Sequence, residues 1–77
     1  MLTVTLDRFP EDEQEEFARA CEQCRHPKED FLIICRGGDV AAVWIPSGKS
    51  RRYKAFDGQS WTVPFQADLI DQYFRMV

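Results

Sequence analysis

The cysteines and the single histidine are the side chains of this chain best suited to chemistry. Cys21, Cys24 and His26 form the pattern C-x-x-C-x-H, and Cys35 follows later. Thiolates and imidazole are preferred zinc ligands, and C-x-x-C is the usual first half of a tetrahedral site. The second half of the motif is missing, and the pair falls within a predicted helix instead of a tight turn. We therefore expect no metal or other cofactor, and a zinc site of these four residues is a lesser alternative.

Other patterns of catalytic chemistry are absent from the sequence. No serine or cysteine lies in a nucleophile motif, and no glycine-rich cofactor loop occurs. Carboxylates are concentrated in the segment EDEQEE at 11–16. That segment is predicted to be an exposed helix face, where pKa values shift little. We expect a non-enzymatic protein, and a small enzyme built around His26 or a zinc-binding domain ranks third.

A basic and aromatic segment at 49–56, KSRRYKAF, offers binding chemistry. In single-stranded nucleic-acid sites, aromatic rings stack on bases and cations follow the phosphates. The net charge of -3 does not support a general nucleic-acid binder, but it leaves room for a local basic patch. A nucleic-acid-binding module that uses Lys49, Arg51, Arg52 and Lys54 is therefore the alternative function.

Two kinds of hydrophobic periodicity predict the elements that position these residues. Gly37-Gly38 joins two apolar runs and is typical of a two-residue hairpin with a type I′ turn. The expected strands are 2–6, 31–36, 39–45, 50–56 and a short 60–63, and the expected helices are 10–25 and 64–77. The prediction is one α+β domain spanning residues 1–77, with the order β-α-β-β-β-(β)-α. Its antiparallel β-meander of three to four strands packs against two helices.

The hairpin register divides the sheet into two faces, because side chains alternate along a strand. The register places Arg36 opposite Asp39 and Phe31 opposite Trp44. The first face holds Phe31, Ile33, Cys35, Val40, Ala42, Trp44, Tyr53 and Ala55. The second holds Leu32, Ile34, Ala41, Val43, Ile45, Arg52, Lys54 and Phe56, and Trp61 and Val63 join it across the Asp57-Gly58 turn. We expect the first face, which is almost wholly apolar, to form the core.

The second face combines an apolar centre with a basic edge, and its fate depends on the helices. If both helices pack on the first face, the second is an exposed patch of the kind that marks an interface. If the helices divide between the faces, the patch is buried. The main hypothesis is a small regulatory, adaptor-like domain that docks a protein partner or a second copy through this face. The expected contact residues are Arg52, Lys54, Phe56 and Trp61.

The cellular setting follows from what the sequence lacks. No apolar run reaches the length of a membrane span, and the first residues do not resemble a secretory signal. Three cysteines cannot all pair within one chain, so reduced thiols are the simplest interpretation. We expect a cytoplasmic protein, bacterial or phage-like in its compactness, that makes no membrane contact.

Overall fold

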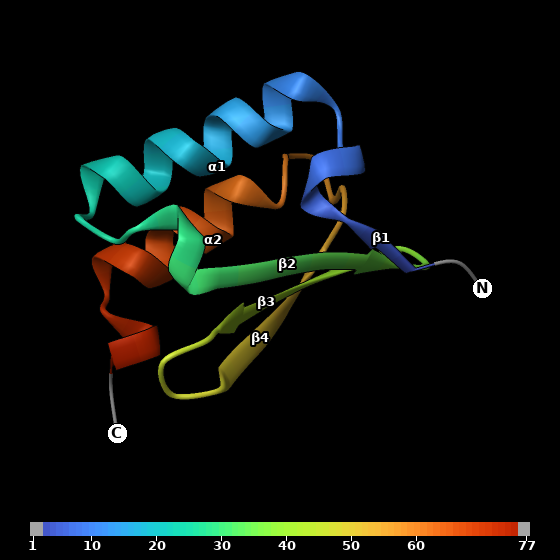
Figure 1. Ribbon diagram of the computed structural model, residues 1–77. Helices are drawn as coiled ribbons and strands as arrows, with labels where there is room; N and C mark the ends of the chain where they lie inside the picture. Colours follow the sequence, from blue (N-terminus) through green and yellow to red (C-terminus); the bar gives the residue numbers. More distant parts are fainter. Residues whose placement is uncertain (1–2, 76–77) are drawn as a thin grey trace.

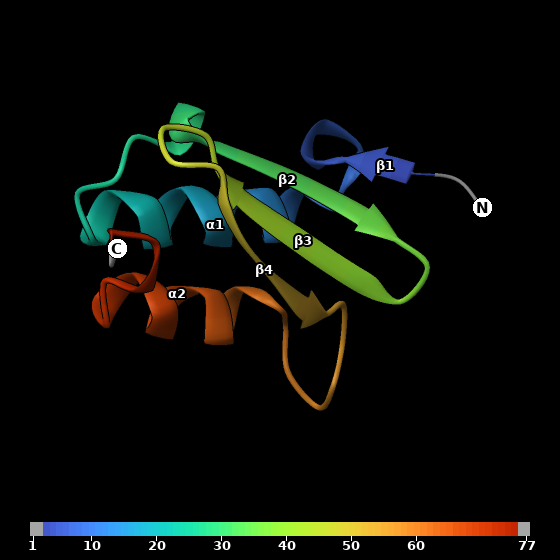
Figure 2. The same ribbon diagram turned by 90° about the horizontal axis from the view of Figure 1, so that it is seen from below.

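The computed structural model describes residues 3–75 and shows an antiparallel sheet with both α-helices on the same side (Figures 1 and 2). The strands are β1 (Thr3–Thr5), β2 (Phe31–Arg36), β3 (Asp39–Trp44) and β4 (Lys49–Lys54). The helices are α1 (Glu11–Gln23) and α2 (Thr62–Ile70), with 3-10 turns η1 (Leu6–Arg8), η2 (Lys28–Asp30) and η3 (Tyr73–Arg75). This architecture confirms the α+β class and the order β-α-β-β-β-α. The predicted strand residue Leu2 and helix residue Val77 lie outside the described residues.

The central hairpin has the predicted register. Arg36 pairs with Asp39, and Phe31 pairs with Trp44. The turn type differs from the expected one, because only Gly37 has a positive φ, 64°. A type I′ turn needs positive φ at both central residues, whereas a type II′ turn needs it only at the first. The neighbouring strands follow in sequence order, so the sheet is a simple meander.

The third strand of the meander pairs two residues away from the expected register. The loop between β3 and β4 spans residues 45–48, because Trp44 pairs with Lys49 and Val40 pairs with Tyr53. The predicted strands 39–45 and 50–56 leave the four loop residues at 46–49, which would pair residue 45 with residue 50. A shift of two residues in the pairing leaves every side chain on its predicted face, since the side-chain period of a strand is two.

The core lies between the predicted first face and the two helices. Ile33, Val40 and Ala42 are buried there. Phe65 of α2 lies at the centre of an aromatic cluster and is fully buried. Its ring contacts rings from α1, β2, β4, the α2 N-terminus and η3, namely Phe17, Phe31, Tyr53, Trp61 and Phe74. These contacts hold both helices on one face, and the opposite face of the sheet is left open (Figure 2).

The structure of the segment after β4 differs from the sequence prediction. The expected strand at 60–63 is reduced to one isolated bridge between Phe56 and Ser60. Helix α2 begins at Thr62, earlier than the predicted start at Pro64, and Ser60 Oγ accepts the Thr62 N–H at 3.3 Å. Trp61 therefore enters the core at the start of α2, with 0% of its surface exposed. The prediction that placed Trp61 on the second face is wrong, because the strand alternation ends before this residue.

Replacement of Phe65 tests the aromatic cluster. Phe65→Ala removes a side chain that touches both helices and the sheet, so we expect a loss of about 3–5 kcal/mol in the free energy of unfolding. That loss is a large part of the roughly 4–12 kcal/mol expected for a domain of this size. Urea denaturation followed by tryptophan fluorescence measures it. The control Val63→Ala changes a half-exposed position of the same helix and should shift stability by about 0.5 kcal/mol or less.

Candidate functional site

The face of the sheet opposite the helices carries an apolar centre and a charged end. We call it the open face. Leu32 is 46% exposed, and Ile34, Ala41 and Val43 are half-buried neighbours. Strand pairing and alternation place eleven described residues on this face: Thr3, Thr5, Leu32, Ile34, Arg36, Asp39, Ala41, Val43, Ser50, Arg52 and Lys54. The residues of β2, β3 and β4 that were predicted for the second face thus lie together and uncovered, whereas the predicted member Val63 lies on α2, and β1 adds two threonines at the border.

The charged end of the open face contains a depression between two arginines. Arg36 and Arg52 line a cavity of about 420 Å³ together with Ile34, Ala41 and Asp39. Asp39 is engaged with Lys54, whose Nζ lies 3.8 Å from the Asp39 Oδ1. Within residues 3–75, neither Arg36 nor Arg52 forms an ion pair. The depression therefore offers two guanidinium groups beside an apolar surface.

The four basic residues predicted for nucleic-acid binding do not share one surface. Arg52 and Lys54 lie on the open face, whereas strand alternation turns Lys49 and Arg51 to the helix side. There both cations lie over the Tyr73 ring, at 4.4 Å for Lys49 Nζ and 4.8 Å for Arg51 Cζ. Arg51 also lies 3.4 Å from Asp68 of α2. The predicted basic strand is thus divided between the open face and contacts with Tyr73 and Asp68.

Two of the four predicted partner-binding residues lie away from the open face. Trp61 is in the core, where its Nε1 donates a hydrogen bond of 2.7 Å to Glu13 of α1. Phe56 is 76% exposed, but it follows the end of β4 and borders a different cavity. Arg52 and Lys54 remain on the open face, and Arg36 joins them. The sequence signal for Arg36 is its even-numbered position in β2, because alternation puts it on the same face as Leu32 and Ile34.

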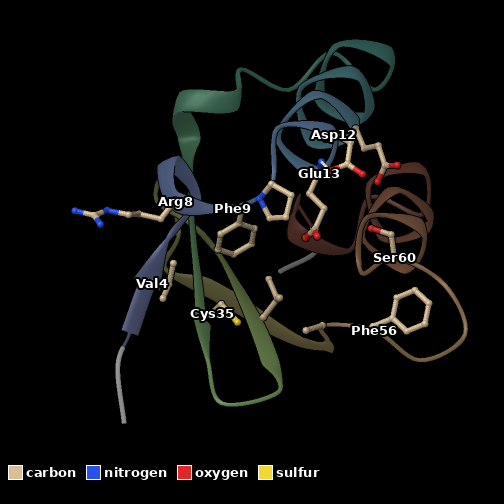
Figure 3. A pocket seen from close by; sticks show the side chains of 12 residues that line it. Val4, Arg8, Phe9, Asp12, Glu13, Cys35, Phe56 and Ser60 are labelled. Atoms are coloured by element: carbon tan, nitrogen blue, oxygen red, sulfur yellow. Dashed lines mark hydrogen bonds between the residues drawn. The ribbon is translucent and has the colours of Figure 1, made fainter.

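A second cavity, of about 440 Å³, opens between the first turns of α1 and the helix-facing side of the sheet (Figure 3). We call it the wedge pocket. Its lining comprises Val4, Arg8, Phe9, Pro10, Asp12, Glu13, Glu16, Cys35, Val40, Ala55, Phe56 and Ser60. Apolar side chains from the strands form its floor, and carboxylates of α1 stand at its rim. No sequence pattern indicates this pocket, because it depends on how α1 lies over the sheet.

The zinc alternative has no supporting geometry in the described part of the chain. Cys21 is buried on α1, and burial, reinforced by the nearby Cys24, raises the pKa of its thiol to about 12. Cys35 lies on β2 and lines the wedge pocket beside the N-terminal end of α1. Within residues 3–75, no group of three or more Cys, His, Asp or Glu residues is arranged to hold a metal ion. Cys21 and Cys24 are instead part of the packing at the C-terminal end of α1.

His26 has a structural environment at the end of α1. Arg25 adopts a left-handed conformation with φ 59°, and the His26 N–H donates to the Cys21 carbonyl at 2.9 Å, which closes the helix. The imidazole is 5% exposed and packs edge-on against Phe31 and Trp44. Within the described residues, His26 Nδ1 and Trp44 Nε1 are buried without hydrogen-bond partners. This apolar site suits a neutral imidazole.

Comparison with protein-family models, with curated proteins and with solved structures finds no match to this chain. Between Thr3 and Arg75, none of the helices has the length and apolar character that crossing a membrane requires.

Acidification tests the environment of His26. Burial lowers the pKa of this imidazole below its usual 6.5, the charge of Arg75 acts in the same direction, and Asp30 opposes them. The unfolded chain binds the proton more readily, so the stabilising effect is fully present above about pH 6.5 and is lost as the pH falls toward the lower folded-state value. We expect the urea midpoint to be lower at pH 5.5 than at pH 7.5. His26→Gln removes this titration, and an equal decline in that variant would assign the effect to carboxyl groups.

Proposed function

We propose that this protein is a non-enzymatic docking domain that binds a protein partner through its open face. The observation that carries the proposal is the packing of both helices on one face of the sheet (Figure 2). The opposite face then exposes a continuous apolar centre around Leu32, which is 46% exposed. Burying such a centre against a partner is favourable by about 25 cal/mol for each Å² of apolar surface. The residues on this face include neither histidine nor cysteine, which suits binding more than catalysis.

The chemistry of the partner follows from the charges beside the apolar centre. Arg36 and Arg52 lack ion pairs within the described residues and flank the depression over Ile34 and Ala41. Guanidinium groups bind carboxylates in a bidentate geometry, so the complementary surface is an apolar segment that carries Asp or Glu. Among the eleven residues of its open face, a second copy would offer these arginines only one carboxylate, Asp39, and that carboxylate is engaged with Lys54. An acidic protein partner is therefore a better fit than a symmetric homodimer.

Nucleic acid fits the open face less well than a protein does. Recognition of single strands needs aromatic rings on which bases stack. The eleven residues assigned to the open face include no aromatic side chain, and Lys49 and Arg51 face the helix side.

The three cysteines are free thiols, which supports a reducing compartment such as the cytoplasm as the place of action.

Variants on the two sides of the molecule test the proposal. The partner is isolated by affinity capture, identified, purified and titrated against the wild-type protein by calorimetry. Leu32→Ser removes the exposed apolar centre and Arg52→Glu reverses a guanidinium charge, so each should raise the Kd about tenfold or more. The matched controls are Ile70→Ser and Arg19→Glu, which change exposed residues of α2 and α1. They should leave the Kd within about twofold, as expected for sites outside an interface.

Three outcomes would contradict this function. Equal loss of affinity in the control variants would place the interface elsewhere on the molecule. Sedimentation showing a dimer that Leu32→Ser dissociates would replace the acidic partner by a second copy. Tight binding of a single-stranded oligonucleotide, with an affinity that falls steeply as salt rises, would favour nucleic-acid recognition.

A further inference from the structure

We infer that the wedge pocket is a second binding site, and that it accepts an apolar side chain presented next to a basic residue by a partner protein. The pocket lies on the helix-covered side of the sheet, whereas the docking surface proposed above lies on the open face. The two sites therefore share no residue, and either proposal can fail without the other.

The floor of the wedge pocket is suited to an apolar group. Val4, Cys35 and Val40 come from three neighbouring strands, and Ala55 follows the fourth. Phe9, at the entry to α1, closes the inner end with its ring against Trp61. The volume of about 440 Å³ lies within the range of pockets that hold small organic groups. An aromatic or branched aliphatic side chain would fit within this space and displace water from its apolar lining.

Two carboxylates at the rim are held in place by the core. Glu13 Oε1 accepts the Trp61 Nε1–H at 2.7 Å, and Glu16 Oε1 accepts the Thr62 hydroxyl at 2.8 Å. Both donors belong to residues that are at least 95% buried, so the carboxylates are attached to a rigid support. Each contact uses one oxygen, and in the described part of the chain Oε2 of either residue accepts no hydrogen bond. The second oxygens are therefore available to a ligand.

The charge at the rim defines the ligand more closely. Asp12 adds a third carboxylate to the pocket lining, and Arg8 is the sole basic residue of that lining. The Arg8 side chain extends away from the cavity (Figure 3). Among residues 3–75, neither Glu13 nor Glu16 forms an ion pair. A cation placed at the rim, beside an apolar group on the floor, complements this arrangement.

Phe56 indicates that the ligand is a peptide segment and not a small free amine. Its ring stands at the edge of the pocket across from Val4 and is 76% exposed (Figure 3). A small amine on the floor would leave this ring in water. A peptide chain that enters the pocket with one side chain would pass over the ring and bury it, and exposed aromatic side chains are frequent anchors of such contacts.

Three capped dipeptides that differ in one charge test the chemistry of the site. Acetyl-Phe-Arg-amide, acetyl-Phe-Gln-amide and acetyl-Phe-Glu-amide are titrated to about 10 mM against ¹⁵N-labelled protein, a range suited to the weak affinity of so small a ligand. The arginine peptide should shift the amide signals of Val4, Cys35, Val40 and Ala55. The glutamine peptide should bind about fivefold more weakly, the effect of one partly exposed ion pair. The glutamate peptide should produce no shifts.

Charge-neutral variants of α1 identify the carboxylates. Glu13→Gln and Glu16→Gln keep an oxygen that accepts the core hydrogen bonds while removing the charge, so the fold is retained. Each should weaken the arginine peptide about fivefold and leave the glutamine peptide unchanged. Glu15→Gln makes the same change at an exposed position outside the pocket and should alter neither titration.

The thiol of Cys35 gives an independent readout of occupancy. The arginine peptide should slow alkylation of Cys35 by iodoacetamide, as measured by peptide mass mapping. Cys24, at the other end of α1, serves as the internal control and should react at an unchanged rate.

Several results would overturn the inference. Equal binding of the three dipeptides would exclude charge recognition, and an absence of shifts at the pocket would exclude the site. An equal effect of Glu15→Gln would show only a general electrostatic attraction. If phenethylamine bound more tightly than the arginine peptide, the pocket would be a site for free amines, and a peptide segment would be excluded as its ligand.

Discussion

The rest of the structure depends on the burial of Phe65. Its ring meets Phe17 of α1, Phe31 of β2 and Tyr53 of β4, so one side chain joins both helices to the central part of the sheet. A short chain that concentrates its aromatic surface in one interface can form a core on one side of a sheet only, since a domain of this size buries a limited share of its surface. The covered face, the open face and the wedge at the end of α1 all follow from this asymmetry.

The hairpin and the identity of the core face could be predicted from the sequence because both depend on local rules. Gly37-Gly38 defines a tight turn, and the period of two assigns Ile33 and Leu32 to opposite faces. Even the two-residue error in the β3–β4 register left the residues of β4 on their predicted faces, since only an odd shift exchanges the faces. Trp61 was misplaced because alternation was continued through Asp57-Gly58, where the chain leaves the sheet and turns into α2.

The two candidate sites differ in how much of each could be predicted from the sequence. The open face is a consequence of strand parity, but whether it is covered depends on where α2 packs, and that is decided by contacts between residues distant in the chain. The wedge pocket is harder to predict from the sequence than the open face. It requires the angle between α1 and the sheet and the contacts that Glu13 and Glu16 make with residues at the start of α2. Tertiary geometry of this kind produces no periodic pattern in the amino-acid sequence.

The division of each central strand between two faces has a consequence for how this protein can change. Substitutions at Leu32, Ile34, Ala41 or Arg52 alter the open face, while Ile33, Val40 and Ala42, which pack against the helices, stay the same. Alternate residues of the same short strands thus form the exposed surface and the core. The open face can therefore change by point mutation while the side chains that pack against the helices are kept, which makes the sheet a suitable scaffold for the directed evolution of binders.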